Sequence, residues 1–202
     1  MTTSYPASPW RLSAHAYVGT SLVPVDRLPE LPPGCRAITV RGKAIVGVPY
    51  FVYEQPSPLV YNEIMATVLV RRSWRPYVHI TQIWVDSPAS RDGGRALWAI
   101  PKDLADFDVV PHSSYDSSYE GAVIGSLQVE RSRSLPIPLP IGFTIIQERD
   151  GAILETKVRG RGRLGRAKVR WAFNPDGPLG FLSGHEPFLT LSLKKLRIVF
   201  GS

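Results

Sequence analysis

Residues 93–107 read Gly-Gly-Arg-Ala-Leu-Trp-Ala-Ile-Pro-Lys-Asp-Leu-Ala-Asp-Phe, and their only lysine, Lys102, directly follows a proline. Residues 96–100 carry no charge, which predicts a buried strand. Pro101 cannot donate a ladder hydrogen bond but suits the first turn of a helix, so we expect a brief helix there with Asp103 in its first turn. Lys102 would then lie at the positive end of a helix dipole and against the core. Both features disfavour a charged lysine.

A reactive lysine must lose its proton, because only the neutral amine attacks a carbonyl. An ordinary lysine titrates near pH ~10.4 and is almost fully protonated at neutral pH. Burial can lower that value by up to ~3–5 pH units, whereas a helix dipole contributes only roughly 0.3–1 kcal/mol. Burial would therefore be the main cause of a reactive Lys102. The alternative is a surface lysine whose amine stays in water at a strand end.

Three segments resemble the acetoacetate decarboxylase family. Residues 94–102 resemble its active-site segment, Gly-Arg-Glu-hydrophobic-Trp-Gly-hydrophobic-Pro-Lys, whose lysine forms a Schiff base with the substrate. Residues 61–63, Tyr-Asn-Glu, resemble a Tyr-x-Glu strand that carries an active-site carboxylate, and residues 83–87 resemble a strand that packs under the site. The resemblance covers roughly residues 10–200.

This resemblance implies that Lys102 and Glu63 are catalytic and that Tyr61 and Trp98 bind the substrate. Read from alternation alone, Glu63 would be a solvated strand residue and Tyr61 could equally belong to the core. Arg95 would fix the loop or an interface rather than touch the substrate.

The chain also departs from the family pattern. The type enzyme has a second lysine directly after the nucleophile, where this chain has Asp103. An acid there cannot lower a lysine pKa by like-charge repulsion. The family's arginine near the amino-terminal strand has no clear match in residues 14–19. The substrate therefore cannot be carried over from the family.

Two functions follow from these observations. The first is a Schiff-base lyase that acts on a small oxo acid or a related carbonyl compound, by decarboxylation of a 3-oxo acid or by aldol or dehydration chemistry. It needs no metal and no organic cofactor. The alternative is a non-catalytic member of the same superfamily that binds a small ligand. A third, less favoured reading is a basic adaptor for an anionic polymer.

Length and composition are typical of a single globular domain. With 202 residues, 44% of them hydrophobic, the sequence fits a single domain over residues 1–202, with residues 1–9 as a flexible arm. The sequence contains no run of about 18 apolar residues, so we expect no membrane span. Residues 1–9 lack an apolar signal core. One cysteine, Cys35, excludes an internal disulfide and favours a reducing, cytoplasmic location. The family resemblance implies a homo-oligomer.

Many short strands and few helices predict a mainly β (α+β) fold, with antiparallel sheets closed into a barrel or cone. The family resemblance implies a β-cone of the same kind. We expect a helical turn at residues 25–32, a turn or short helix at 87–94 and a polar loop at 111–118. We expect strands at residues 15–25, 35–40, 43–53, 60–71, 77–85, 107–110, 119–131, 141–148, 152–159, 164–173 and 188–199.

The net charge of +7 is concentrated late in the chain. Basic residues alternate at 157, 159, 161 and 163 and again at 166, 168 and 170, which places each set on one strand face. We interpret them as the solvated faces of a hairpin that turns near Gly162 or Gly165. The alternatives are contact with an anionic partner or another subunit, or an arginine that faces the cavity and holds a substrate carboxylate. No aromatic side chains interleave with them, so nucleic acid is not an expected partner. The four histidines show no ligand spacing, and no metal site is expected.

Overall fold

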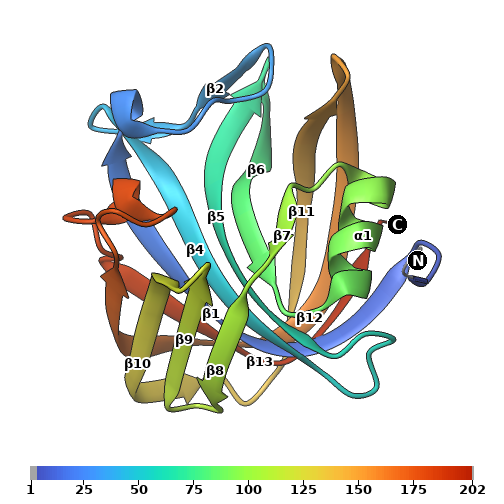
Figure 1. Ribbon diagram of the computed structural model, residues 1–202, viewed down its shortest axis with the longest axis vertical. Helices are drawn as coiled ribbons and strands as arrows, with labels where there is room; N and C mark the ends of the chain where they lie inside the picture. Colours follow the sequence, from blue (N-terminus) through green and yellow to red (C-terminus); the bar gives the residue numbers. More distant parts are fainter. Residues whose placement is uncertain (1–3, 202) are drawn as a thin grey trace.

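Strands make up most of the computed structural model, which describes residues 4–201 (Figure 1). These residues form one 13-stranded sheet and a single α-helix. The elements in chain order are β1 (Trp10–Pro24), η1 (Val25–Arg27), β2 (Cys35–Ala37), β3 (Thr39–Val40), β4 (Lys43–Glu54), β5 (Tyr61–Arg72), β6 (Arg75–Val85), α1 (Pro88–Trp98), β7 (Lys102–Leu104), β8 (Asp106–Val110), β9 (Ser114–Tyr119), β10 (Ala122–Ser134), β11 (Leu139–Arg149), β12 (Ala152–Phe173), η2 (Gly180–Leu182) and β13 (Leu189–Phe200).

Seven strands close into a ring. The order β11-β6-β5-β4-β1-β13-β12 returns to its start because β11 also pairs with β12. Neighbours are antiparallel except for two parallel contacts of β6, with β11 and with β7. The predicted mainly β, α+β fold with closed antiparallel pairing and few helices is confirmed.

The sheet buries apolar side chains on both of its faces. One cluster lies inside the ring and includes Trp10, Leu12, Ile83 and Ile198. The other lies on the opposite face, where β8, β9 and β10 form a separate group of strands in Figure 1, and includes Tyr115 and other residues of β9 and β10. Burial on both faces explains why β5 is apolar almost throughout rather than alternating.

The order of helix and strand around Lys102 is the reverse of the prediction. The helix α1 precedes the lysine, and Lys102 itself begins β7. The Ser87 side chain caps α1 by accepting a hydrogen bond from the Ser90 amide at 3.2 Å, and Pro88 occupies its first turn. Ala99 ends the helix in the left-handed conformation, with φ of 55°. A short apolar run does not distinguish a strand from a last helical turn, so residues 96–98 end α1 although their composition predicts a strand.

Two further predictions are wrong. Residues 152–173 form one continuous strand rather than a hairpin, because Gly160 and Gly165 serve close packing instead of a turn. A β-carbon on Gly160 would collide with the Arg197 carbonyl, and one on Gly165 would collide with the Arg133 carbonyl. A polar loop was expected at residues 111–118, but residues 114–118 belong to β9, which pairs with β8 and β10.

The amino-terminal arm predicted at residues 1–9 lies partly outside the described residues, which begin at position 4. Within the described part, the Trp10 indole donates to the Pro6 carbonyl at 2.8 Å, and the Ser8 hydroxyl donates to the Gly201 carbonyl at 3.2 Å. These contacts bring both ends of the described chain beside α1 (Figure 1). None of the helices in the described range has the length and hydropathy that crossing a membrane requires.

Candidate functional site

The side chain of Lys102 is buried, with 4% of the residue exposed. Its ammonium donates to the Glu63 carboxylate (Oε2) at 2.7 Å, to the Ser90 hydroxyl at 2.9 Å and to the Tyr61 hydroxyl at 3.4 Å. Three acceptors thus meet the three donors of one ammonium group. These three partners satisfy the amine fully.

Strand pairing places the lysine and the carboxylate together. Glu63 on β5 pairs with Val85 on β6, and Ile83 on β6 pairs in parallel with Lys102 on β7. The helix covers them from the side: Ser90 lies in its first turn, and Gly94 one turn later contacts the lysine stem. The segment from β6 through α1 to β7 therefore supplies Lys102 and Ser90, and β5 supplies Glu63 and Tyr61.

Two tyrosines complete the surroundings of Glu63, which is 2% exposed. The Tyr53 hydroxyl donates to Oε1 of Glu63 at 3.0 Å, so both carboxylate oxygens have a partner. The rings of Tyr53 and Tyr61 stack with their centroids 4.4 Å apart. Burial, followed by the nearby Glu63 charge, raises the pKa of both phenols well above 10. Both tyrosines therefore stay protonated and can donate hydrogen bonds.

The electrostatic surroundings of Lys102 differ from the prediction, because the lysine begins a strand and does not lie at the amino-terminal end of a helix. The helix ends before the lysine, so burial disfavours the charge and Glu63 stabilises it. A carboxylate at 2.7 Å can also accept the ammonium proton.

A cavity of about 330 Å³ begins at this pair and continues inside the ring of strands. Lys102, Glu63, Tyr61 and Trp98, the four site residues that the sequence indicated, all line it. Trp98 packs edge-on against Trp10, with centroids 4.8 Å apart, and is 6% exposed. The structure thus brings the four residues to one place.

Sequence reasoning missed Ser90 and Tyr53. Tyr53 pairs directly with Tyr61 across β4 and β5, so a correct register would have placed it beside Glu63. Ser90 could be found only with the helix assigned correctly, because its position depends on the first turn of α1.

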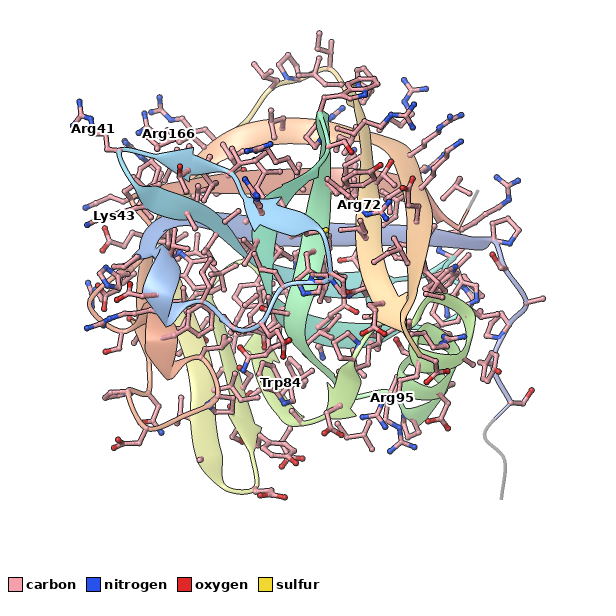
Figure 2. All side chains as sticks on the ribbon, turned by 90° about the horizontal axis from the view of Figure 1, so that it is seen from above. Arg41, Lys43, Arg72, Trp84, Arg95 and Arg166 are labelled. Atoms are coloured by element: carbon pink, nitrogen blue, oxygen red, sulfur yellow. The ribbon has the colours of Figure 1, made fainter. Side chains whose placement is uncertain are left out.

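Two charged residues close to Lys102 in the sequence, Arg95 and Asp103, pair with each other and not with its amine. Arg95 donates to the Lys102 carbonyl at 2.5 Å and lies 3.6 Å from the Asp103 carboxylate. About half of the Arg95 side chain is exposed, and Figure 2 shows it at the outside of the molecule. Asp103 is therefore matched by Arg95 rather than by the buried amine.

The basic residues of β12 lie on the outer face of the strand, with Arg166 at the periphery in Figure 2. Glu130 on β10 pairs with Lys168 at 2.7 Å and with Arg170 at 3.2 Å. This arrangement fits the interpretation of a solvated face, although on one strand instead of two. Among residues 4–201, no group of three or more His, Cys, Asp or Glu side chains could hold a metal ion.

Comparison with known proteins places these features in a family. The family model described as acetoacetate decarboxylase (ADC) matches residues 26–135. Comparison with curated proteins gives no match. Several solved structures share the fold at low sequence identity.

The acetoacetate decarboxylase from Legionella pneumophila subsp. pneumophila str. Philadelphia 1 is 17% identical with a TM-score of 0.71, covering 98% of this chain and 87% of that one. The enduracididine biosynthesis enzyme MppR, complexed with the condensation product of pyruvate and imidazole 4-carboxaldehyde, is 15% identical with a TM-score of 0.65, covering 99% and 89%. An acetoacetate decarboxylase-like enzyme from Sphingomonas wittichii RW1 is 16% identical with a TM-score of 0.65, covering 98% and 92%. Because the family model spans more than half of its residues, this chain belongs to the acetoacetate decarboxylase family.

Proposed function

We propose that this protein is a Schiff-base-forming lyase that acts on an oxo acid or a related carbonyl compound through Lys102. The observation that carries the proposal is a buried amine 2.7 Å from a buried carboxylate at one end of a cavity. Such a pair supplies both a nucleophile and a group that can take and return its proton.

The first step converts an amine and a carbonyl into an imine and water. Glu63 takes a proton from the Lys102 ammonium, and the neutral nitrogen attacks the carbonyl carbon. The carbon–nitrogen bond forms, and the carbonyl oxygen leaves as water after receiving two protons, with Glu63 as one donor. The protonated imine that remains is covalently bound to Lys102 and carries one positive charge.

The positive imine then accepts an electron pair from a neighbouring carbon–carbon or carbon–hydrogen bond. In a 3-oxo acid, the bond to the carboxylate breaks and carbon dioxide leaves. In the aldol or dehydration branch, a proton leaves the carbon next to the imine, and the resulting enamine forms or breaks a bond to a second carbonyl carbon. Tyr53 holds the Glu63 carboxylate in position during either step, and we assign substrate contact to Tyr61 and Trp98.

The comparisons support this class of chemistry. The related folds include an acetoacetate decarboxylase and an enzyme whose structures hold pyruvate or a condensation product of pyruvate. We further propose that the protein forms a single domain, is a homo-oligomer and works in the cytoplasm, where its one cysteine stays reduced.

A non-catalytic ligand-binding role is the second candidate. It is favoured by the complete satisfaction of the Lys102 amine and by Asp103 in place of a second cation, because a fully paired ammonium can be a structural element of the core.

Borohydride reduction in the presence of pyruvate or acetoacetate separates the two. The expected result is a stable mass adduct that peptide mapping places on Lys102, absent from Lys102→Met and retained in Lys168→Met, whose lysine is exposed. Binding of these compounds with no adduct at Lys102 would remove the covalent mechanism and leave the ligand-binding role.

A further inference from the structure

The cavity is long compared with the smallest oxo acids. Along β5 its wall includes Tyr61, Glu63, Met65 and Thr67, which alternate on the inner face. The six residue steps from Tyr61 to Thr67 span roughly 20 Å at about 3.3 Å per step. The volume of about 330 Å³ corresponds to roughly ten water-sized groups at about 30 Å³ each. A four-carbon oxo acid would leave most of this space unfilled.

Beyond its lysine end the cavity is lined by apolar side chains. Thr67 is the one polar side chain there among the described lining residues, and its hydroxyl already donates to the Gly47 carbonyl at 3.2 Å. The other groups of this wall come from all the surrounding strands and include Val18, Phe51, Val78, Ile145, Leu164 and Leu191. A ligand in this part of the cavity would gain from apolar contact and would find no free hydrogen-bond partner.

The cavity also lacks a cation for a substrate carboxylate. Within the described lining, Lys102 and Glu63 are the charged residues, and they neutralise each other at 2.7 Å. Arg95 is occupied outside with Asp103 and the Lys102 carbonyl. A carboxylate carried into the apolar part would be buried without a counter-charge, which is strongly unfavourable.

We propose that the substrate is a ketone or aldehyde whose remainder is an uncharged apolar chain or ring that fills the cavity away from Lys102. This inference rests on the proposed function and narrows it, because a substrate without a carboxylate uses the aldol-type branch rather than decarboxylation. The carbonyl reaches the polar end, where imine formation releases one water, and the apolar remainder extends toward Thr67.

The test compares methyl ketones of increasing length in borohydride trapping: acetone, 2-hexanone and 2-nonanone. The concentration that gives half-maximal labelling of Lys102 is expected to fall roughly two- to fourfold per added methylene group. A matched charged probe, 5-oxohexanoate, keeps the chain of 2-hexanone but ends in a carboxylate. It is expected to label at least tenfold more weakly than 2-hexanone at equal concentration.

A variant of the apolar wall links the preference to the cavity. Val78→Phe narrows the part away from Lys102, and the ratio of 2-nonanone to acetone labelling is expected to fall at least tenfold. Leu191→Phe serves the same purpose should the first variant not fold. An unchanged ratio in a folded variant overturns the assignment of the chain to this cavity.

The remaining outcomes separate this inference from the proposed function. Labelling of Lys102 that does not improve with chain length, or that favours 5-oxohexanoate, overturns the apolar substrate and leaves the Schiff-base chemistry standing. No labelling by any probe removes the Schiff-base chemistry. In that case, ligand binding to Lys102→Met is measured through the fluorescence of Trp10 and Trp98, which line the cavity. Tighter binding of 2-nonanone than of acetone supports an apolar ligand. Equal or weaker binding of 2-nonanone overturns the apolar ligand.

Discussion

Gly94 lies directly against the stem of Lys102: a β-carbon at position 94 would stand 2.7 Å from Cδ and 2.9 Å from Cε of the lysine. The helix α1 therefore packs on the lysine through a glycine face. Ser90, one turn earlier, reaches the amine of the same side chain at 2.9 Å. Helix and lysine thus form one packed unit in which the position of the amine depends on the absence of a side chain.

Gly94→Ala is expected to displace the Lys102 side chain and to slow its labelling by carbonyl compounds on the order of 10²-fold, because a shift of about 1 Å is enough to misalign a reacting group. Labelling rates under borohydride measure the effect. Gly142→Ala is the matched control, since a β-carbon there meets its nearest neighbour, the Val158 carbonyl, only at 3.9 Å. Equal rates for the two variants would contradict the packing argument.

Glu63→Leu is expected to destabilise the protein by about 3–5 kcal/mol, because it leaves the buried Lys102 charge without its partner. The double variant Glu63→Leu with Lys102→Met removes both charges and should recover most of that loss. Denaturant unfolding of the single and double variants gives the free energies of unfolding. A double variant no more stable than the single one would show that the ion pair does not govern the stability of this part of the core.

Tyr53→Phe removes the hydrogen bond to Oε1 of Glu63 and should cost about 1 kcal/mol of stability. Because the carboxylate then turns more freely, we also expect slower labelling of Lys102. Tyr77→Phe removes a comparable bond, 2.9 Å to Glu155, away from the site and should affect stability alone. Labelling rates of Lys102 and thermal unfolding midpoints, measured for both variants, distinguish them. Equal labelling rates in the two variants would argue against a positioning role for Tyr53.

Arg149→Ala is expected to destabilise α1 at its carboxyl end by about 1–2 kcal/mol. Its guanidinium donates to the Arg95 and Ala96 carbonyls, the latter at 3.0 Å, and thereby satisfies the last turn of the helix. Amide hydrogen exchange in α1 should be faster in the variant than in the natural chain, whereas exchange in β5 should be the same in both. Unaltered exchange in the helix would mean that its packing on Lys102, not this cap, sets its stability.

Stability should fall as the pH drops below about 6.5, partly through His79. Burial lowers the pKa of this histidine below 6.5 in the folded chain. The unfolded chain then binds more protons between the two values, so the contribution is complete above pH 6.5 and is lost on acidification until the folded pKa is passed.

In His79→Gln the loss of stability between pH 7.5 and pH 5.0 should be smaller, though not absent, because His15 also has a lowered pKa. Unfolding midpoints across this pH range provide the measurement. Identical slopes in the variant and the natural chain would exclude His79 as a source of the pH dependence.

The strands were predictable to within a few residues where their apolar pattern ends at a clear turn. Residues 60–71 and 77–85 correspond to β5 and β6, and residues 141–148 lie within β11. The failures share a physical cause. The glycines inside β12 resemble a turn in sequence, and the short apolar run at the end of α1 resembles a strand. In both cases only the neighbours in space decide which structure forms.

The sequence by itself determined a β-rich core, a lysine after Pro101 and a carboxylate two residues after Tyr61. It could not place Ser90 and Tyr53 beside them, since the Ser90 contact joins α1 to β7 and the Tyr53 contact joins β4 to β5. The tertiary structure also decided that Asp103 turns outward to Arg95 and that the cavity beyond Lys102 is apolar. The physical reason is that closure of the sheet into a ring selects which alternate residues face inward, and so fixes the surroundings of the buried Lys102 amine.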